Sequence, residues 1–561
     1  MTGTDRADRR PVASADVCVV GSGPGGALVA DALAGKGHSV VVLEAGERHS
    51  VEDRTRRMEL WLRSDVSHNA FWLEEERDRY TSSGSLFARL NQVRAKGVGG
   101  SSLLWNGNTP RLHEKDFEMA SRYGVGVDWP LGYADLAPYY DAAEREMGVS
   151  GSDDNPHGPP RSESFPMPAF PPSHSDGIFA RACESLGIDM ASQPKAIASE
   201  PYDGRASCSA TGVCNACPVG ARYTSEHHVD RAVERGAHVV DRAQVLELHT
   251  DDRGERVVAA EYATPGGERY RQEADVFVLA AGGIETPRLL LLSDSDAHPD
   301  GLANGSGAVG RYLMDHAEIE VRATVDEPTW QNTVGFTTSR SDQFYVPDGP
   351  TPGTFALVFL NTAGGGVGEH TRKSAAIKQV FGALGDPGVG TLTDAAADPF
   401  NSSTFGDALL DGVPESGGNV LGMRAVAEVL PRPENRVTLD PSTTDNHGRP
   451  VPNVSLSYGD HERRTLERAE EVCREVMAEL GATDTLVVGY EDSDMGSHHL
   501  GTTRMGTDPA TSVVDATGRT HEVENLYVSS SSVFPTGGAV NPTLTIAALA
   551  LRVADSVDAR L

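Results

Sequence analysis

Two side chains near the C-terminal end of this 561-residue chain could together transfer a proton: His498, in the stretch GSHHLGT, and Asn541, in GAVNPT. An imidazole accepts a proton near neutral pH, and a side-chain amide can orient a developing alkoxide. His499 is the second candidate for the base. Taken alone these residues are weak evidence, because paired histidines often lie on loops as ordinary polar residues.

An apolar run at 544–551 follows Asn541 and predicts a buried helix. Asn541 is a favoured N-cap, and Pro542 suits the first helical position, where its missing N–H is no loss. The positive end of the helix dipole would then lie between Asn541 and Thr543, where it could stabilise negative charge on a bound group. A capped core helix that binds nothing is the alternative.

A glycine-rich turn near the start of the chain has the pattern of a dinucleotide site. The pattern comprises, in order, a strand at 16–20, Gly21, Gly23 and Gly26, a helix at 27–35, a strand at 39–43 and Glu44. The glycines permit a tight turn and let a pyrophosphate approach the backbone at a helix N-terminus. Glu44 can accept hydrogen bonds from both ribose hydroxyls, which argues against a 2′-phosphate and leaves FAD or NAD.

A second loop of small residues, KGVGGSSLLWNG at 96–107, contains Gly100, Ser101 and Asn106. This loop could pack closely against a diphosphate and a flavin, whereas an NAD enzyme has no obvious need for a second loop of this kind. The alternative is a surface loop that binds nothing. The preceding segment, 51–94, is charged and looks helical, and it predicts a lid over the cofactor. Its aromatic residues are Trp61, Phe71, Trp72 and Phe87.

Three of the six cysteines lie close together, at Cys208, Cys214 and Cys217. Disulfides are disfavoured in a cytoplasm. The three thiolates could hold a three-iron cluster or supply three ligands to zinc, or they are reduced thiols in a tight loop. We favour reduced thiols in a tight loop among these three alternatives, and we predict no metal site. The remaining cysteines are scattered in apolar settings and predict core positions: Cys18, Cys183 and Cys473.

The rest of the chain reads as two lobes. A Pro-, Ser- and Gly-rich linker at 150–175 leads into the second lobe, and the first lobe resumes with strands at 237–248, 257–262 and 274–283 and a helix at 287–293. Alternating segments predict an antiparallel substrate-binding sheet, at 318–325, 354–360 and 422–430. An amphipathic helix follows at 461–480 and ends at Gly481.

The composition is strongly acidic, with 81 Asp and Glu against 49 Lys and Arg and a net charge of −32. Such a surface repels nucleic acid and anionic membranes, so we exclude these partners. Spread acidity with few lysines favours a halophilic source, in which salt screens the self-repulsion. No apolar segment is long enough to span a membrane, and Arg9 and Arg10 are followed by no apolar signal region, so we expect a cytoplasmic protein.

Seven motifs together resemble the glucose-methanol-choline (GMC) family of flavin oxidoreductases, and the resemblance covers almost the whole chain. In chain order they are GSGPGG with Glu44, GVGGSSLLWNG, AAGGIETPRLLLLS, VGRYLMDH, PRPENRVTLD, HHLGTTRMG and NLYVSSSSVFPTGGAVNPTLTIAALALR. The region around 357–411 carries no such motif, and substrate choice would lie there. The resemblance implies an FAD-dependent oxidation of the CH–OH group of a small alcohol, by hydride transfer to flavin N5.

The family's site residues carry over one by one. His498 occupies the position of the active-site histidine, and Asn541 that of its partner. Val245 resembles an adenine-contacting valine, while Leu104 stands where some members have a histidine joined to the flavin, which favours non-covalent FAD. The family's frequent Asp before Ser-Val-Phe-Pro appears here as Ser530. The implied FAD site comprises Gly21, Gly23, Gly26, Glu44, Gly100, Ser101, Asn106, Val245 and Thr543.

The expected fold is α/β: a Rossmann-like FAD-binding domain with a second, substrate (cap) domain built on an antiparallel sheet. We place the N-terminal region at 14–317, the cap sheet at 318–430 and the C-terminal region, which completes the FAD domain, at 431–556.

The electron acceptor stays open among O₂, a quinone and a cytochrome or partner subunit. The cysteine stretch resembles the iron–sulfur-bearing dehydrogenase subunits of the family, although Ser209 replaces the second of their paired cysteines and the final spacing is shorter. It therefore favours a dehydrogenase over an oxidase. The sequence is also compatible with a simple NAD-dependent dehydrogenase or a non-catalytic electron-transfer subunit, and the alcohol could be a sugar, a polyol, a sterol or a choline-like compound.

Overall fold

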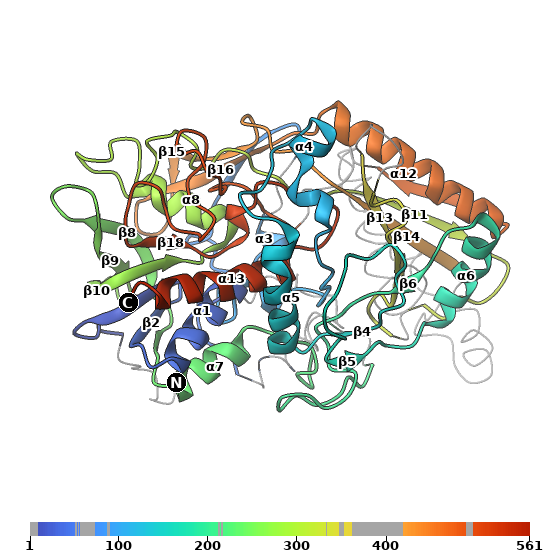
Figure 1. Cartoon of the computed structure of the whole chain (residues 1–561), viewed down its shortest axis with the longest axis horizontal. Coiled ribbons are helices and arrows are strands. Elements are labelled where there is room, and N and C mark those ends of the chain that lie inside the picture. The colour runs from blue at the N-terminus through green and yellow to red at the C-terminus, as the bar shows by residue number, and fades with distance from the viewer. Residues whose placement is uncertain are drawn as a thin grey trace, which may run out of the picture.

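The computed structural model describes residues 9–50, 53, 55, 73–86, 90–210, 214, 217–331, 334–346, 353–361, 419–489 and 497–561. The four aromatic residues of the expected lid and most of the region expected to choose the substrate lie outside these residues. The chain forms two lobes side by side, each built on its own sheet (Figure 1). In the described part of the chain, no helix is long and apolar enough to cross a membrane.

The first lobe is built on a seven-stranded sheet in the order β7-β2-β1-β10-β9-β8, with β18 also paired to β10. The strands are β1 (Ala15–Val20), β2 (Val40–Leu43), β7 (His238–Val240), β8 (Gln244–Thr250), β9 (Val257–Ala263), β10 (Arg269–Leu279) and β18 (Leu526–Val528). The long strand β10 pairs in parallel with β1 and β18 through its second half and antiparallel with β9 through its first half. The nearly unbroken apolar runs of β1 and β2 are buried on both faces, as is typical of a parallel sheet covered by helices.

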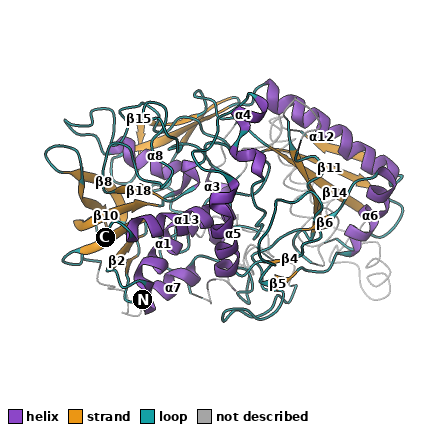
Figure 2. Cartoon of the chain, in the orientation of Figure 1, coloured by secondary structure: helices purple, strands orange, loops and turns teal. Residues whose placement is uncertain are grey.

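Helices cover this sheet and bring the two ends of the chain together. They are α1 (Pro24–Gly35), α5 (Tyr133–Met147), α7 (Glu226–Glu234), α8 (Gly282–Leu292) and α13 (Thr543–Asp558). Helix α1 packs against both α7 and α13, and α13 packs against α5 (Figure 2). The C-terminal segment therefore lies directly beside the glycine-rich turn at the start of the chain.

The second lobe is a six-stranded sheet in the order β17-β11-β14-β13-β12-β6. Its strands are β6 (Ala191–Ser192), β11 (Ala317–Thr324), β12 (Ser339–Ser341), β13 (Phe355–Leu360), β14 (Val420–Ala427) and β17 (Thr483–Val488). All its pairings are antiparallel, as the alternating sequence predicts. Helix α12 (Asp460–Glu479) packs on β11 and β14, and α6 (His174–Leu186) packs against α12. Strands β6 and β17 come from outside 318–430, and the domain boundaries stay a prediction.

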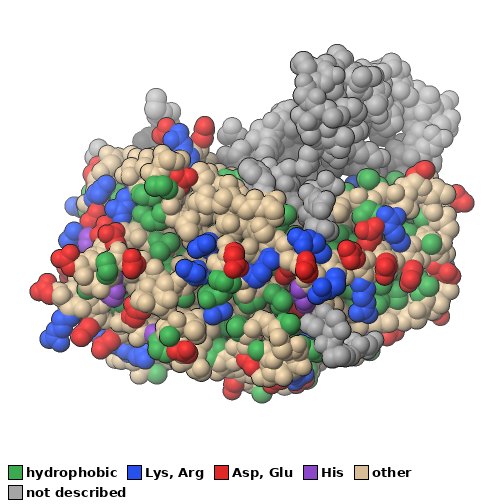
Figure 3. All heavy atoms as spheres, turned by 90° about the horizontal axis from the view of Figure 1, so that it is seen from above, with side chains coloured by type: hydrophobic (Ala, Val, Ile, Leu, Met, Phe, Trp, Pro, Cys, Tyr) green, Lys and Arg blue, Asp and Glu red, His purple; other side chains and the backbone are tan. Residues whose placement is uncertain are grey.

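Several short elements complete the part of the chain that the structure describes. They are β3 (Thr81–Gly84), α3 (Leu90–Val93), the 3₁₀ helices η2 (Gly100–Leu103), η3 (Glu114–Phe117) and η4 (Ser531–Val533), α4 (Met119–Tyr123), β4 (Ser150–Gly151), β5 (Met167–Pro168), β15 (Arg436–Thr444) and β16 (Pro450–Leu456). Strands β15, β16 and β3 form a separate small sheet, and β4 pairs with β5 inside the expected linker. Side chains of both charges are interspersed on the face shown in Figure 3.

Several local predictions were wrong. Residues 81–84 form a strand in a segment expected to be helical, because they pair with β16. The expected strand at 237–248 divides into β7 and β8, where Arg242 adopts a left-handed φ of 52°. Strand β10 ends at Leu279, and α8 begins at Gly282 rather than at 287. Helix α13 has Pro542 as its N-cap, so Asn541 lies outside the helix with its side chain free for another contact.

Candidate active site

A cavity of about 480 Å³ lies at the carboxyl ends of the parallel strands and collects segments from across the chain. This edge of a parallel sheet is where α/β proteins bind nucleotides. The predicted residues that line it are Gly21, Gly23, Glu44, Gly100, Ser101, Asn106, Val245, His498, Asn541 and Thr543. The dinucleotide-type turn and the candidate proton-transfer pair therefore share one cavity.

Gly26 is the predicted cofactor residue that does not line this cavity. A Cβ atom at Gly26 would lie 2.0 Å from the carbonyl oxygen of Gly21, so this glycine lets α1 pack closely against the turn. Gly25, which we did not single out, has the same role on another side: its Cβ would lie 2.0 Å from the carbonyl oxygen of Ser529.

The two glycine loops meet at the N-terminus of α1. A Cβ atom at Gly100 would lie 2.8 Å from the Cα of Gly23, whereas a Cβ at Gly23 meets no atom closer than 4.0 Å. The backbone of the first turn of α1 is thus left open to the cavity. This arrangement fits a pyrophosphate, which needs close approach to backbone N–H groups at the positive end of a helix.

Glu44 lies at the end of β2, buried at the cavity wall. One of its carboxylate oxygens accepts hydrogen bonds from the backbone N–H of Ser22 at 3.0 Å and from the Ser22 hydroxyl at 2.7 Å, and the other accepts the N–H of Gly46 at 3.0 Å. Burial raises the pKa of Glu44, and these hydrogen bonds oppose the shift. The side chain is therefore held in place at the position where a ribose would be recognised.

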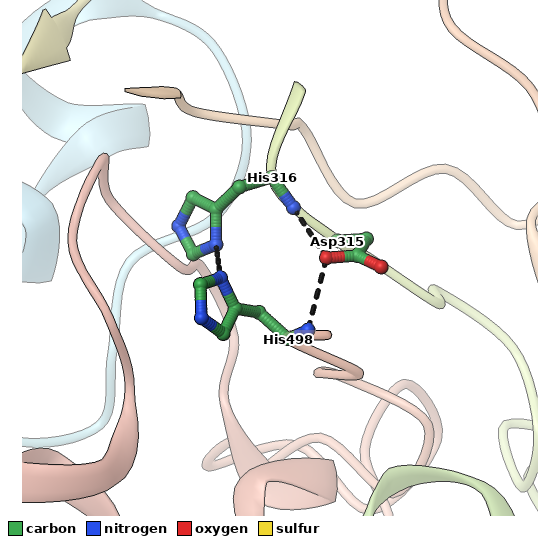
Figure 4. Close-up of side chains that lie close together, drawn as sticks. All are labelled: Asp315, His316 and His498. Carbon is green, nitrogen blue, oxygen red and sulfur yellow. Dashed lines mark hydrogen bonds between the residues drawn. The ribbon is translucent and has the colours of Figure 1, made fainter. Parts of the chain in front are cut away.

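His498 and Asn541 lie in direct contact. The Asn541 amide nitrogen Nδ2 is 3.0 Å from His498 Nε2. The other ring nitrogen of His498, Nδ1, is 2.9 Å from Nδ1 of His316, whose Nε2 lies 2.9 Å from the carbonyl oxygen of Gly538. Asp315 Oδ1 accepts the backbone N–H groups of His316 at 2.8 Å and of His498 at 3.0 Å, as Figure 4 shows.

Both imidazoles in this cluster are neutral at physiological pH. Burial lowers the pKa of His498 well below its ordinary value, and His316, His499 and Arg424 lower it further. Burial likewise lowers the pKa of His316 to about 4. The pKa of the Asp315 carboxyl is raised to about 8, because its burial outweighs the two backbone hydrogen bonds that it accepts. His498 can therefore serve as a proton acceptor over a wide pH range.

His499 also lines the cavity, but within the described part of the chain no hydrogen bond joins its ring to Asn541. Its Nε2 atom is buried and has no hydrogen-bond partner among the described residues, and burial lowers its pKa to about 3. Its carbonyl oxygen accepts a hydrogen bond of 2.6 Å from the Ser531 hydroxyl. The geometry thus favours His498 over His499 as the base.

The remaining residues of interest also line the cavity. Leu104 presents an aliphatic side chain to the cavity. Ser530 also lines it, and its hydroxyl accepts the backbone N–H of Ser532 at 3.2 Å at the start of η4. Asn541, Pro542 and Thr543 bring the N-terminus of α13 to the cavity, as the sequence led us to expect.

One charged group of the substrate-lobe sheet, Arg424, lies near His498, although it does not line the cavity. Along β11 the buried residues alternate with half-buried ones, and the half-buried set includes Glu318 and Glu320. Arg424 on β14 forms ion pairs with Glu318 at 3.2 Å and with Glu320 at 2.8 Å. Because α12 covers the apolar face of the sheet, these three side chains lie on the other face, and Arg424 is near enough to lower the pKa of His498.

The three clustered cysteines are free and half-buried, and they pack beside a small apolar cluster that includes Ile197 and Phe336. Two groups of described residues have donor atoms close enough together to surround a metal ion, and the cysteines form neither of them. One is Asp315, His316 and His498, and the other is Asp31, Glu146 and His228. Most of the atoms that could bind a metal are engaged by hydrogen bonds or ion pairs, for example between Asp31 and Arg231 at 2.7 Å, whereas Asp315 Oδ2 has no hydrogen-bond partner among the described residues.

Sequence reasoning missed several residues of the site. Asp315 and His316 end the VGRYLMDH motif, but nothing in their local sequence shows that they reach a residue 182 positions away. Glu285 lines the cavity and is bound by Lys96 at 3.0 Å and Arg94 at 2.8 Å, and positive charge around it holds its pKa well below its ordinary value. The motif IETPR could have pointed to Glu285.

Family models, relatives of known activity and a solved structure were each compared with this chain. Models described as GMC oxidoreductase match residues 79–318 and 431–550, and a model of the NAD(P)-binding Rossmann-like domain matches 19–75. The chain is 31% identical to the fructose dehydrogenase large subunit of Gluconobacter japonicus, over 97% of this chain and 98% of that one. It is 32% identical to 2-methyl-1,2-propanediol dehydrogenase of Mycolicibacterium austroafricanum, over 97% of this chain and 95% of that one.

Among solved structures, pyridoxine 4-oxidase from Mesorbium loti superimposes with a TM-score of 0.64 at 19% identity. The superposition covers 97% of this chain and 99% of that one, so the two share a fold over their whole length.

Proposed function

The chain belongs to the GMC oxidoreductase family, and we propose that it oxidises the CH–OH group of a polar alcohol with His498 as the proton acceptor and Asn541 as its partner. The observation that carries this proposal is the contact between His498 and Asn541 inside the cavity that also contains the glycine turn. The family acts on alcohol groups, so the chain is an oxidoreductase; the roles of individual residues are our proposal.

GMC oxidoreductases bind FAD. In this chain the open backbone at Gly23 would receive the pyrophosphate, Glu44 the ribose, and the N-terminus of α13 the flavin end. When bound, FAD supplies the acceptor for the hydride that leaves the alcohol carbon. We infer that it is held non-covalently, because Leu104 offers no nucleophile at the position where some members join the flavin.

His498 takes the hydroxyl proton at Nε2, the nitrogen that faces Asn541. The two groups lie 3.0 Å apart, and a substrate oxygen that replaces their mutual hydrogen bond can contact both: its proton is directed to the imidazole, and the amide N–H donates to the oxygen as it gains negative charge. Because the pKa of His498 is lowered, the imidazole is free to accept at neutral pH.

The substrate is a polar alcohol such as a sugar or a polyol. The sheet face next to His498 carries Glu318, Glu320 and Arg424, whose paired charges suit hydroxyl groups and disfavour an aliphatic chain. Two of the relatives have names that refer to polyhydroxylated substrates, fructose and 2-methyl-1,2-propanediol.

We infer a dehydrogenase rather than an O₂-using oxidase, with a quinone or a partner subunit as the electron acceptor. The support is the cysteine stretch and the similarity to a protein named as the large subunit of fructose dehydrogenase. An absorption spectrum and an iron assay on one purified sample test this part. Flavin bands with stoichiometric iron would support a dehydrogenase that passes electrons through an iron–sulfur cluster to a partner. Flavin without iron would leave an O₂-using oxidase as well supported as a dehydrogenase.

The proposed base is tested by the matched substitutions His498→Ala and His499→Ala. Anaerobic reduction of the bound flavin by sugars, polyols and a long-chain alcohol is followed by stopped-flow absorbance. We expect His498→Ala to keep its flavin but to reduce it about 10²- to 10⁴-fold more slowly, the usual contribution of a general base. His499→Ala should stay within a few-fold of the unaltered protein.

Normal reduction in His498→Ala would refute the assignment. Loss of reduction only in His499→Ala would transfer the role to that residue. Flavin that no alcohol reduces in the unaltered protein would instead support an electron-transfer subunit.

A further inference from the structure

The contact between His316 and His498 joins two ring nitrogens, and such a contact needs one donor and one acceptor. The two Nδ1 atoms lie 2.9 Å apart, with the ring planes at 81° to each other. A neutral imidazole has one N–H and one lone pair, so the contact fixes which nitrogen of each ring carries the proton, once the direction of one hydrogen bond is known.

The carbonyl group of Gly538 gives that direction. A carbonyl oxygen can only accept, so His316 Nε2, at 2.9 Å from it, carries a proton. Neutral His316 then has its lone pair on Nδ1, and His498 must donate to it from its own Nδ1. The lone pair of His498 is therefore on Nε2, where the Asn541 amide donates to it at 3.0 Å. All three hydrogen bonds run in one consistent direction.

This direction requires His316 to be neutral, and its surroundings make it so. Its side chain is buried, at 1% exposure. Asp116 and Glu428 favour a proton on the ring, but burial outweighs both and lowers the pKa of His316 to about 4. Lys115 bonds to both of those carboxylates, at 2.9 Å and 3.3 Å, and so offsets their charge.

Backbone hydrogen bonds fix the positions of the His316 and His498 rings relative to each other. Met314 and Leu500 form an antiparallel bridge with two hydrogen bonds of 3.0 Å, and Asp315 Oδ1 accepts the backbone N–H groups of the two histidines. The segment before β11 and the segment that carries the base are thus joined by backbone hydrogen bonds close to the contact between the two rings, and Figure 4 shows those that Asp315 accepts.

From this geometry we propose that His316 is a positioning residue that fixes the Nδ1–H tautomer of His498 and so presents a lone pair on Nε2 to the substrate. The inference rests on the proposed function. The alcohol proton moves to His498 Nε2 while the hydride leaves the carbon for the bound FAD, and the resulting imidazolium keeps its Nδ1–H bond to His316. No proton has to reach His316, whose lone pair stabilises the cation.

The tautomer can be read in the unaltered protein. In protein labelled with ¹⁵N at histidine, long-range ¹H–¹⁵N correlation spectra distinguish Nδ1–H from Nε2–H rings, and the His498 signals are those absent from His498→Gln. We expect the Nδ1–H form for His498 and the Nε2–H form for His316 at pH 7. An Nε2–H form of His498 would overturn the proposal, whatever the variants do.

Two substitutions of His316 test the effect on the reaction. Asn can place an acceptor oxygen near the position of the imidazole Nδ1, whereas Phe preserves the ring shape without any acceptor. We expect His316→Phe to retain flavin and substrate affinity but to slow flavin reduction at least about tenfold, a part of what the base itself contributes. His316→Asn should recover most of that loss.

Equal rates in His316→Phe and the unaltered protein would overturn the proposal. So would equal losses in the two variants, since these would indicate a structural role. If His498→Ala is slow while His316→Phe is normal, the proposed base stands and only the role of His316 fails. Metal bound at Asp315, His316 and His498 would also overturn it, and elemental analysis of the same samples detects that outcome.

Discussion

The reactivity of His498 depends on groups that lie far from it in the chain. Its imidazole is kept neutral by burial and by the nearby positive charge of Arg424, which belongs to the opposite lobe. Asn541 approaches it from the start of α13, because Pro542 rather than Asn541 caps that helix. A proton acceptor is thus assembled from residues whose individual sequence contexts are unremarkable.

Asp315 gives a pH prediction at the level of one residue. Its ordinary pKa of 3.8 is raised to about 8 in the folded protein. Between these values the folded protein holds a proton that the unfolded chain has released, so this contribution to stability is complete below about pH 4 and is lost as the pH rises toward 8. Asp315→Asn removes a group that can ionise and should therefore flatten this part of the pH profile.

The measurement is the free energy of unfolding of both proteins, from denaturant titrations between pH 4 and pH 9. We expect the variant to gain on the unaltered protein by a few kcal/mol across this window, at most about 1.4 kcal/mol per pH unit. The new amide nitrogen takes the place of the unpartnered Asp315 Oδ2, and any pH-independent loss of stability that it causes shifts the plot of unfolding free energy against pH without changing its slope. Parallel pH profiles for the two proteins would contradict the prediction.

At the level of elements, helix α1 fits its neighbours through glycines that have no space for a side chain. Gly25→Ala would place a Cβ atom 2.0 Å from the carbonyl oxygen of Ser529, a backbone atom that cannot move without displacing β18. We expect a loss of roughly 1–3 kcal/mol in the free energy of unfolding, typical of overpacking, together with weaker FAD binding.

Gly177→Ala is the matched control, because Gly177 lies in α6 and its Cβ would meet no atom within 4 Å. There the substitution should stabilise the protein by about 0.5–1 kcal/mol, since alanine favours the helix. Thermal unfolding and flavin release, measured on both variants, check the pair. Equal behaviour of the two variants would show that α1 does not depend on this contact.

Elements with strong periodicity could be predicted from the sequence, and those defined by their partners could not. Helix α12 and strand β11 follow from a 3.6-residue and a two-residue repeat, respectively. The polar strand β3 exists because β16 pairs with it, and α8 begins at Gly282, so that Pro287 lies inside the helix rather than at its start. The glycine turn, Glu44 and His498 were recognisable as motifs, whereas His316 acquires its role only when the fold brings it to His498.

At the level of the whole molecule, the chain combines two lobes with a large negative charge. The C-terminal segment supplies both α13, which packs on α1, and the residues that face the substrate lobe. The site therefore depends on the docking of segments from both ends of the chain. Anything that expands the folded protein should affect cofactor retention before it affects the secondary structure of either lobe.

Repulsion among the acidic side chains, which give a net charge of −32, favours expansion of the folded protein. We therefore predict that the stability of the protein rises with ionic strength. Screening shortens the Debye length from about 30 Å at 0.01 M salt to about 3 Å at 1 M, so repulsion between carboxylates is almost removed over this range. We expect the midpoint of thermal unfolding and the temperature of flavin release to rise together as NaCl is added. Na₂SO₄ at equal ionic strength separates screening, which depends on ionic strength alone, from the stronger stabilisation that excluded sulfate gives any protein. A midpoint that is the same at low and high NaCl would mean that the carboxylates are already balanced by their ion pairs, and it would remove the argument for a salt-adapted protein.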